Sequence, residues 1–173
     1  MRNLVLTIAV VLLLFGCSSK EKNLGNSEIT PSVQEEIQTT MEQEGFFNPE
    51  DIFHYENKGE YIFVLSHTLQ KGIQVTTFKN SSEGLKMMDT TETSEATLVS
   101  PTKNDGPYLM AIQPEDPDVK DVKAFGKQTK LIKINKEYTE DFKDEIKCWI
   151  FIDNEIGKSP EEYNEIEDIE YIK

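Results

Sequence analysis

Cysteine is scarce in this sequence, which has only Cys17 and Cys148 among its 173 residues. If Cys17 is covalently modified, Cys148 has no partner within the chain, and a fold held together by disulfides is excluded. The domain must then be stabilised by packing alone. A hydrophobic content of 37% is enough for a modest core, and the length corresponds to one folded domain.

Basic residues are also few, since 18 Lys and Arg stand against 32 Asp and Glu, giving a formal net charge of -14. Residues 1–16 contain one charged side chain, Arg2, so their removal brings the charge to -15. Such a chain repels nucleic-acid phosphates and anionic lipid head groups. We therefore expect no nucleic-acid partner. The charge favours a basic protein or peptide, or a divalent cation that bridges the domain to an anionic polymer.

Residue types that carry catalysis or bind metals are sparse. The only histidines are His54 and His67, and neither belongs to a His-Glu-x-x-His or Cys-x-x-Cys zinc pattern. No Gly-x-Ser-x-Gly motif or phosphate-binding glycine loop is present. Cys148 alternates with isoleucines, which predicts a buried, inert thiol and not a nucleophile. We expect no catalytic residue, no metal site and no cofactor-binding residue.

The longest apolar run lies near the N-terminus. Arg2 precedes residues 4–15, which are apolar except for Thr7. This run is too short to span a bilayer, which takes about 20 residues. Its length and the preceding positive charge are typical of a secretory signal peptide. The alternative is an uncleaved membrane anchor with an unmodified Cys17.

The apolar run ends in Leu14-Phe15-Gly16-Cys17. This junction resembles the lipobox of bacterial lipoproteins, although Phe15 is larger than the residue usual at its position. The resemblance implies cleavage after Gly16 and a covalent diacylglyceryl lipid on Cys17. Because two acyl chains suffice for stable anchoring, it also implies a protein held in the lipid bilayer at the extracytoplasmic face of the cell membrane.

Composition divides the chain into four parts. Residues 1–16 are the signal peptide, and residues 17–30 carry the lipidated cysteine and a polar tether with too few apolar side chains to form a core. Residues 31–153 are predicted to form a β-rich globular domain. Residues 154–173 form an acidic C-terminal segment.

One helix is predicted at the start of the globular part. Pro31 suits a first helical position, Ser32 and Glu35 have capping-box spacing, and Gly45 is a natural stop. The apolar residues between them recur at helical spacing and predict one buried stripe. This stripe consists of Val33, Ile37 and Met41.

Short apolar runs between turn residues predict an antiparallel β-structure. With Lys58-Gly59 as a two-residue loop, Tyr55 pairs with Ile62; with Gly126-Lys127 as a type II′ turn, Val122 pairs with Leu131. The polar stretch 90–95 is predicted to be a loop. Residues 146–152, with isoleucines on one face and aromatic residues on the other, are predicted to form a central strand. The remaining predicted strands are 52–57, 60–65, 73–79, 85–89, 96–100, 108–113, 119–125 and 128–134.

The acidic C-terminal segment has an ambiguous pattern. Tyr163, Ile166, Ile169 and Ile172 recur every three residues. A short amphipathic helix, an acidic tail and a strand all remain open.

The acidic C-terminal segment, with carboxylates at 161–170, could dock a basic partner, and an acidic cluster near the second hairpin is the other candidate contact surface. It consists of Glu115, Asp116, Asp118 and Asp121. Calcium takes six to eight oxygen ligands, which makes such a cluster worth testing, but its spacing does not match an EF-hand loop. The alternative is a solvated acidic turn held by Pro114 and Pro117.

The second hairpin and the following strand also carry a family resemblance. Val119-Lys120-Asp121-Val122, Gly126-Lys127 and Lys147-Cys148-Trp149 resemble a group of uncharacterised small lipoproteins of Bacillus-type bacteria. The resemblance covers about half of the mature chain and implies a fold but no activity. Together with the strand pattern, it predicts a mainly β protein with an N-terminal helix (α+β), built as an antiparallel meander or small sandwich of short strands.

Three classes of function compete. The first is a non-enzymatic binding or interaction module at the cell envelope, which fits a small anchored domain without a recognisable catalytic set. The second is an envelope-acting hydrolase with an unrecognised site. The third is an atypical solute-binding component of a transporter, although the mature chain is shorter than a two-lobed receptor.

Overall fold

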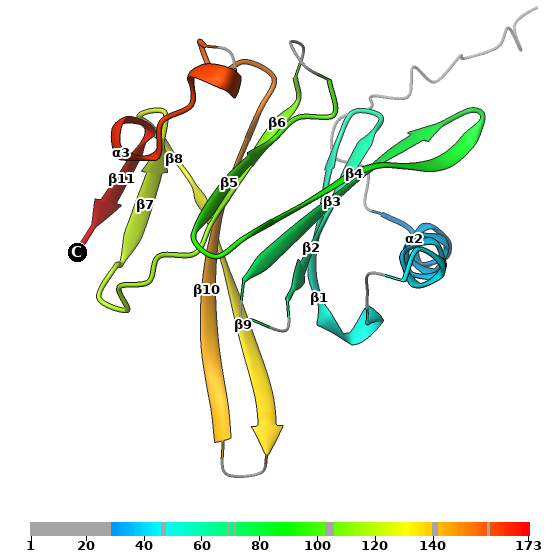
Figure 1. The fold of residues 1–173 in the computed structure, drawn as a ribbon, viewed down its shortest axis with the longest axis horizontal. Helices are drawn as coiled ribbons and strands as arrows, with labels where there is room; N and C mark the ends of the chain where they lie inside the picture. The colour runs from blue at the N-terminus through cyan, green and yellow to red at the C-terminus, as the bar shows by residue number, and fades with distance from the viewer. Residues whose placement is uncertain are drawn as a thin grey trace, which may run out of the picture.

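The protein is described by a computed structural model that covers residues 29–45, 48–68, 70, 72–102, 106–139, 142–158 and 160–173. Side chains of residues 136–139, 142–144 and 160 are not described. The lipidation site Cys17 and the predicted signal peptide lie outside these residues. The described part contains one N-terminal helix and three small antiparallel sheets, which confirms the predicted fold class (Figure 1).

The first sheet is formed by consecutive strands. In the second and third sheets the chain order is interrupted, because β7 and β8 belong to the third sheet and the chain then returns to the second with β9 and β10. The first has the order β1-β2-β3-β4, the second β5-β6-β10-β9 and the third β11-β7-β8. Helix α2, Pro31–Gln43, precedes them, and two short helical turns separate β10 from β11. The other elements are η1 Pro49–Asp51, β1 Ile52–Lys58, β2 Tyr61–His67, β3 Ile73–Ser81, β4 Gly84–Thr93, β5 Ala96–Val99, β6 Tyr108–Ile112, β7 Asp121–Ala124, β8 Lys127–Gln128, β9 Lys130–Thr139, β10 Phe142–Asp153, η2 Pro160–Glu162, α3 Glu165–Asp168 and β11 Ile169–Ile172.

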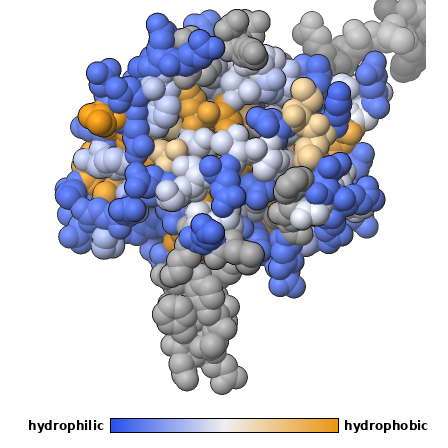
Figure 2. Space-filling model, in the orientation of Figure 1, coloured by the Kyte–Doolittle hydropathy of each residue, from blue (hydrophilic) through white to orange (hydrophobic). Residues whose placement is uncertain are grey.

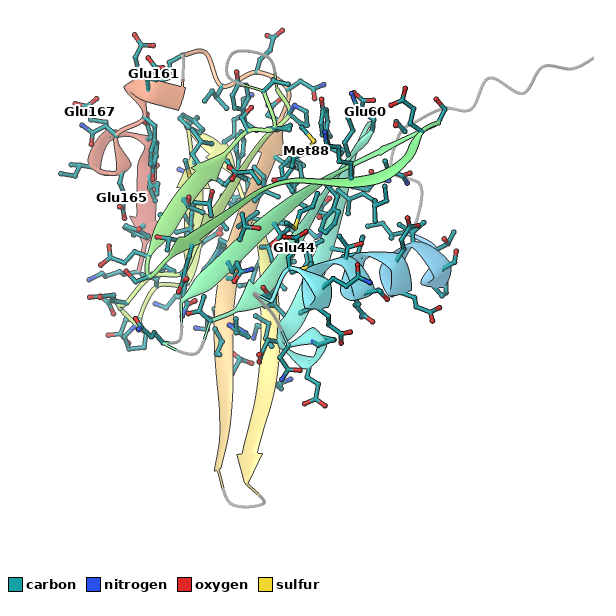
Figure 3. The ribbon with its side chains drawn as sticks, turned by 45° about the vertical axis from the view of Figure 1, so that its right-hand side comes forward. Glu44, Glu60, Met88, Glu161, Glu165 and Glu167 are labelled. Atoms are coloured by element: carbon teal, nitrogen blue, oxygen red, sulfur yellow. The ribbon has the colours of Figure 1, made fainter. Side chains whose placement is uncertain are left out.

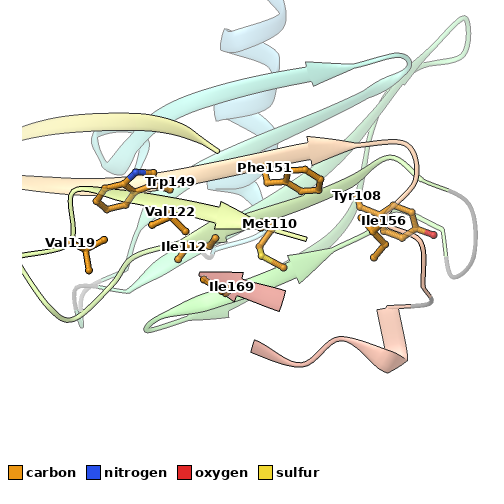
Figure 4. Packing of buried hydrophobic residues seen from close by; sticks show 10 residues of the cluster. Tyr108, Met110, Ile112, Val119, Val122, Trp149, Phe151, Ile156 and Ile169 are labelled. Carbon is orange, nitrogen blue, oxygen red and sulfur yellow. The ribbon is translucent and has the colours of Figure 1, made fainter. Parts of the chain in front are cut away.

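Alternation of side chains along the strands builds three successive cores. The first lies between α2 and the first sheet, where Ile37 and Met41 pack against Ile62, Val64 and Phe78. The second lies between the first and second sheets and includes Phe63, Leu65, Cys148 and Ile150. The third lies between the second sheet and the third sheet with its C-terminal segment. Figure 4 shows this third core around Met110, Val122, Trp149, Phe151 and Ile169.

Strand β10 is central, as predicted, because it pairs with β6 on one side and β9 on the other. Cys148 and Ile150 face the second core, while Trp149 and Phe151 face the third. Both faces of the strand are therefore buried over residues 148–151, which explains why that stretch is continuously apolar.

Helix α2 confirms the predicted apolar stripe, since Ile37 and Met41 are buried and Val33 packs against the same core. The predicted capping box is wrong. Thr30 is the N-cap and makes no side-chain capping bond; its hydroxyl lies 3.0 Å from the Ser32 hydroxyl instead. Gly45 adopts a positive φ of 75° directly after the helix, as a C-terminal stop requires.

The register of the first hairpin differs from the prediction. Lys58 pairs with Tyr61, so the loop is Gly59-Glu60, and Tyr55 pairs with Val64 rather than Ile62. A change of one residue at each end of the loop preserves the faces. A register shift between Ile52 and His54 then places Phe53 on the opposite face of the sheet from Tyr55, whereas the prediction had put both on one face.

The second hairpin is also corrected. Its loop is Phe125-Gly126, with φ angles of 52° and 71°, the pattern of a type I′ turn and not the predicted type II′ turn at Gly126-Lys127. Val122 pairs with Tyr171, and Leu131 pairs with Trp149. The predicted long hairpin fails because β9 leaves the third sheet after Thr129 and joins β10.

The predicted loop 90–95 is mostly strand. Strand β4 continues to Thr93, where Thr93 pairs with Ile73 and Thr91 with Val75. Threonine is β-branched, so a threonine-rich polar stretch fits an outer strand that is half exposed to solvent.

The C-terminal segment contains two of the three structures that its sequence left open, a short helix and a strand. A 3-10 turn and the one-turn helix α3 precede β11, which pairs with β7. Ile169 is buried in the third core, whereas Ile166 is 92% exposed. Among the helices described here, none combines the length and apolar character needed to cross a membrane.

Candidate functional site

The acidic cluster predicted from the sequence is divided between two structural settings. Glu115 and Asp116 line two pockets, one on each side of the 113–119 loop. Asp118 and Asp121 make local contacts: the Asp118 backbone N–H donates to Asp116 Oδ1 at 2.9 Å, and Gln128 Nε2 donates to Asp121 Oδ2 at 2.5 Å. The four carboxylates therefore do not converge on one point.

The first pocket, hereafter the glutamate pocket, has a volume of about 240 Å³. Glu95, Glu115 and Glu165 line it from three separate parts of the chain. Its apolar lining comes from three further residues. These are Pro114, Val119 and the ring of Tyr171.

Backbone pairing explains why these segments meet. Gln113 N–H donates to the Glu95 carbonyl at 2.6 Å, which holds the entrance to β5 beside the exit from β6. Lys120 N–H donates to the Ile172 carbonyl at 2.8 Å, so β11 runs beside the end of the 113–119 loop. Helix α3 precedes β11 directly and brings Glu165 to the same place (Figure 3).

Like charges dominate the glutamate pocket. The charge of Glu115 raises the pKa of the Glu95 carboxyl above its usual value, with a further contribution from Glu165. Asp116 has the opposite environment, because its carboxylate lies 2.6 Å from Lys173 Nζ and its pKa is lowered by that hydrogen bond. The pocket thus combines an Asp116 carboxylate that is paired with Lys173 and a Glu95 carboxyl that lies close to two further negative charges.

Tyr171 joins the apolar and acidic parts of the pocket. Its side chain is 38% exposed, and its hydroxyl donates to Glu165 Oε1 at 3.2 Å. Desolvation, followed by the charge of Glu165, raises the pKa of Tyr171, so the phenol stays protonated and remains a donor at neutral pH. The bond links the Glu165 carboxylate to the Tyr171 side chain, and both line the same pocket.

The second pocket lies on the other side of the 113–119 loop and has a volume of about 280 Å³. Glu145 and Lys147 from β10 face the loop there, and the buried Trp149 contributes to the wall. Three carboxylates and Lys147 line it, whereas four carboxylates and Lys173 line the glutamate pocket, so the glutamate pocket is the more acidic of the two.

The two histidines lie elsewhere, at the packing between the first two sheets. His54 Nε2 lies 2.9 Å from Glu56 Oε2, which also binds Lys130 Nζ at 2.9 Å. The hydrogen bond from His54 is the largest cause that lowers the pKa of Glu56. His67 is buried, with its ring centroid 4.5 Å from that of Phe53.

Cys148 is fully buried in the second core, as its alternation with isoleucines predicted. Burial raises the pKa of its thiol to about 12. A thiol in this state is neutral at physiological pH, and the neutral thiol is a poor nucleophile.

Metal binding finds little geometric support. Within the described part of the chain, no group of three or more His, Cys, Asp or Glu side chains lies close enough together to hold an ion. The glutamates of the pocket are therefore coupled through charge without forming a set of metal ligands.

Sequence analysis does not single out Glu95, Tyr171 or Lys173 and includes Glu165 only within the acidic C-terminal segment, without placing it beside Glu115. Glu95 lies in a stretch that was predicted to be a loop, and the other three belong to the segment whose structure was left open. No local signal marks them, because the pairing of β11 with β7 and the bond between Gln113 and Glu95 bring them to the 113–119 loop.

No family model, curated protein or solved structure matches this chain.

Proposed function

We propose that the protein is a lipid-anchored, non-enzymatic binding module at the extracytoplasmic face of a cell membrane, and that its acidic surface engages a cationic partner. The lipobox-like Leu14-Phe15-Gly16-Cys17 supports the anchor. The glutamate pocket supports the binding role, because it gathers like charges around an apolar surface.

The observation that carries this proposal is that Glu95, Glu115 and Glu165 line one pocket, where the charges of Glu115 and Glu165 raise the pKa of Glu95. A carboxyl whose pKa is raised by its neighbours is held in an unfavourable ionised state at neutral pH. A bound cation would relieve that repulsion. Such a set of charges costs stability in the free protein and becomes favourable in a complex.

The charge of the whole chain also supports a cationic partner. Figure 2 shows one face of the domain, on which hydrophilic residues predominate and hydrophobic residues form small separate patches. With a net charge of -14, the molecule attracts cationic partners and speeds their approach. An anchored module with this field would act on partners that pass close to the membrane.

The test is binding of a hexalysine peptide to the full chain in a neutral detergent, measured by isothermal titration at several salt concentrations. Raising the ionic strength from about 0.01 M to about 1 M shortens the screening length from about 30 Å to about 3 Å. We expect hexalysine affinity to fall steeply over this range and hexaglutamate to show no binding. Absence of hexalysine binding, or an affinity indifferent to salt, would contradict the proposal.

A further inference from the structure

We propose that the open edge of β10, over residues 143–147, binds one extended segment of a partner polypeptide as an added β-strand. The segment runs antiparallel to β10, along the line of β6 and beyond its end. This inference stands on strand pairing and not on the charge of the acidic surface, so it goes beyond the proposed function.

Strand β10 extends well past the end of its neighbour β6. The two strands pair only over residues 149–153 of β10, opposite Tyr108–Ile112. Within the described residues, 142–148 of β10 pair with β9 alone, and this part of the two strands projects from the body of the domain as a ribbon (Figure 1). A ribbon of two strands is only marginally stable by itself, and a third strand stabilises it.

A proline explains where the pairing of β6 with β10 ends. The Gln113 N–H donates to the Glu95 carbonyl at 2.6 Å, so the backbone of Gln113 faces β5. Because successive residues of a strand direct their backbone groups to opposite sides, the next residue faces β10. That residue is Pro114, which has no N–H to donate. The register of the two strands would place it opposite Lys147, and β6 ends before this point.

The backbone groups on this side of β10 are therefore open. Trp149 faces β6 in the last pair of the two strands, so Lys147 and Glu145 face the same way by the alternation along the strand. No backbone bond to Lys147 or Glu145 from that side is found among the described residues. An unpaired strand edge of this kind is the surface to which extended peptides add.

There is room for a strand beside this edge. The second pocket, of about 280 Å³, lies between the 113–119 loop and β10, where Glu145, Ile146 and Lys147 line it. The loop bounds the pocket at the end where β6 stops. The first residues of an added strand would occupy the pocket, and the following residues would continue along the ribbon.

Side chains along the edge specify the kind of segment that fits. Glu145 and Lys147 lie on one face of the strand, and Ile146 lies on the other. Lys147 is half-buried and forms no ion pair with another described residue. Charge complementarity therefore favours an acidic residue opposite Lys147, an apolar residue opposite Ile146 and a basic residue opposite Glu145. In the antiparallel direction, the partner segment reads acidic, apolar, basic.

The experiment uses the blocked peptide Ac-Glu-Val-Lys-Val-Thr-NH2, titrated by NMR into the full chain in neutral detergent. Its first three residues are designed to lie opposite Lys147, Ile146 and Glu145. We expect the amide signals of residues 145–147 to shift on binding. The amide protons of Glu145 and Lys147 should also exchange more slowly with solvent, because they become hydrogen-bonded to the peptide.

Two N-methylated peptides test the strand pairing itself. The nitrogen of the central lysine faces β10, so a methyl group there removes a hydrogen bond and blocks close approach. This peptide should show no detectable binding. The nitrogen of the first valine faces away from β10, so a methyl group at that position should leave most of the binding intact.

A second pair of peptides tests the charge pattern. The charge-swapped peptide Ac-Lys-Val-Glu-Val-Thr-NH2 has the same composition and should bind about twofold to tenfold more weakly, the effect of two unfavourable cross-strand pairs. The double variant Glu145→Lys with Lys147→Glu should reverse this preference. Unchanged amide spectra away from the ribbon verify that the variant is folded.

The outcomes distinguish the possible occupants of the edge. Equal binding of the two N-methylated peptides, shifts confined to another strand edge, or no binding at millimolar peptide would each overturn the inference. Signals of residues 145–147 that change with protein concentration alone would also overturn it, because they would assign the edge to a second copy of this chain. None of these results depends on hexalysine, whose binding tests only the proposed function.

Discussion

At the scale of single residues, Glu95 links stability to binding. Its pKa is raised in the folded state, so the folded protein holds the proton more tightly than the unfolded chain. The sign follows: its contribution to stability is present at pH values below the unfolded pKa and is lost as the pH rises through the folded pKa. At neutral pH the ionised Glu95 therefore destabilises the domain.

We expect Glu95→Gln to raise the melting temperature at pH 7 and to lose this advantage as the pH falls through the raised pKa of Glu95. Thermal unfolding of both proteins between pH 3 and pH 8 measures the effect. The matched control is Asp116→Asn, which removes the ion pair with Lys173 at 2.6 Å and a carboxyl of lowered pKa. It should lower the melting temperature at pH 7, so equal effects of the two variants would contradict the assignment.

At the scale of elements, two glycines serve different purposes. Gly126 has a positive φ of 71° and open space around its Cα, so its role is conformational. Gly106 enters β6 against the backbone of Asn154, which follows β10, and a Cβ at this position would overlap the Asn154 carbonyl. One glycine permits a turn and the other permits close approach of two chain segments.

We expect Gly106→Ala to cost about 3 kcal/mol, because backbone atoms on both sides must move to accommodate the methyl group. Gly126→Ala should cost about 1–2 kcal/mol, since only the left-handed backbone conformation is penalised. Urea unfolding of the two variants, compared with the unchanged chain, measures both. A larger loss from Gly126→Ala would show that the close contact at Gly106 relaxes easily.

The same scale shows how far the sequence determines the fold. Periodicity located helix α2 and the strands, because burial imposes spacings of 3.6 and 2 on their side chains. It did not give the partners of β9, since a turn with Gly126 at its centre is compatible with two registers and the choice depends on β10, a distant strand. The glutamate pocket depends on another long-range pairing, that of β11 with β7, so the sequence indicates Glu115, Asp116 and Glu165 as acidic residues but not that they line one pocket.

At the scale of the whole molecule, the anchor is the decisive expectation. Cells that express the chain should incorporate radiolabelled palmitate, and Cys17→Ala should abolish the label, because the lipobox-like motif offers that thiol for modification. Cys148→Ala is the matched control and should keep the label, since Cys148 is buried. Labelling of the Cys17→Ala protein would contradict the anchor.

The order of layers gives the molecule a direction. Helix α2 covers the outer side of the first sheet, and the third sheet with the C-terminal segment covers the far side of the second (Figure 1). Packed sheets lie about 10 Å apart, so roughly 20 Å separates the first sheet from the third. The chain enters this stack of layers at α2, so a lipid attached through the preceding residues would join the domain at the end opposite the glutamate pocket.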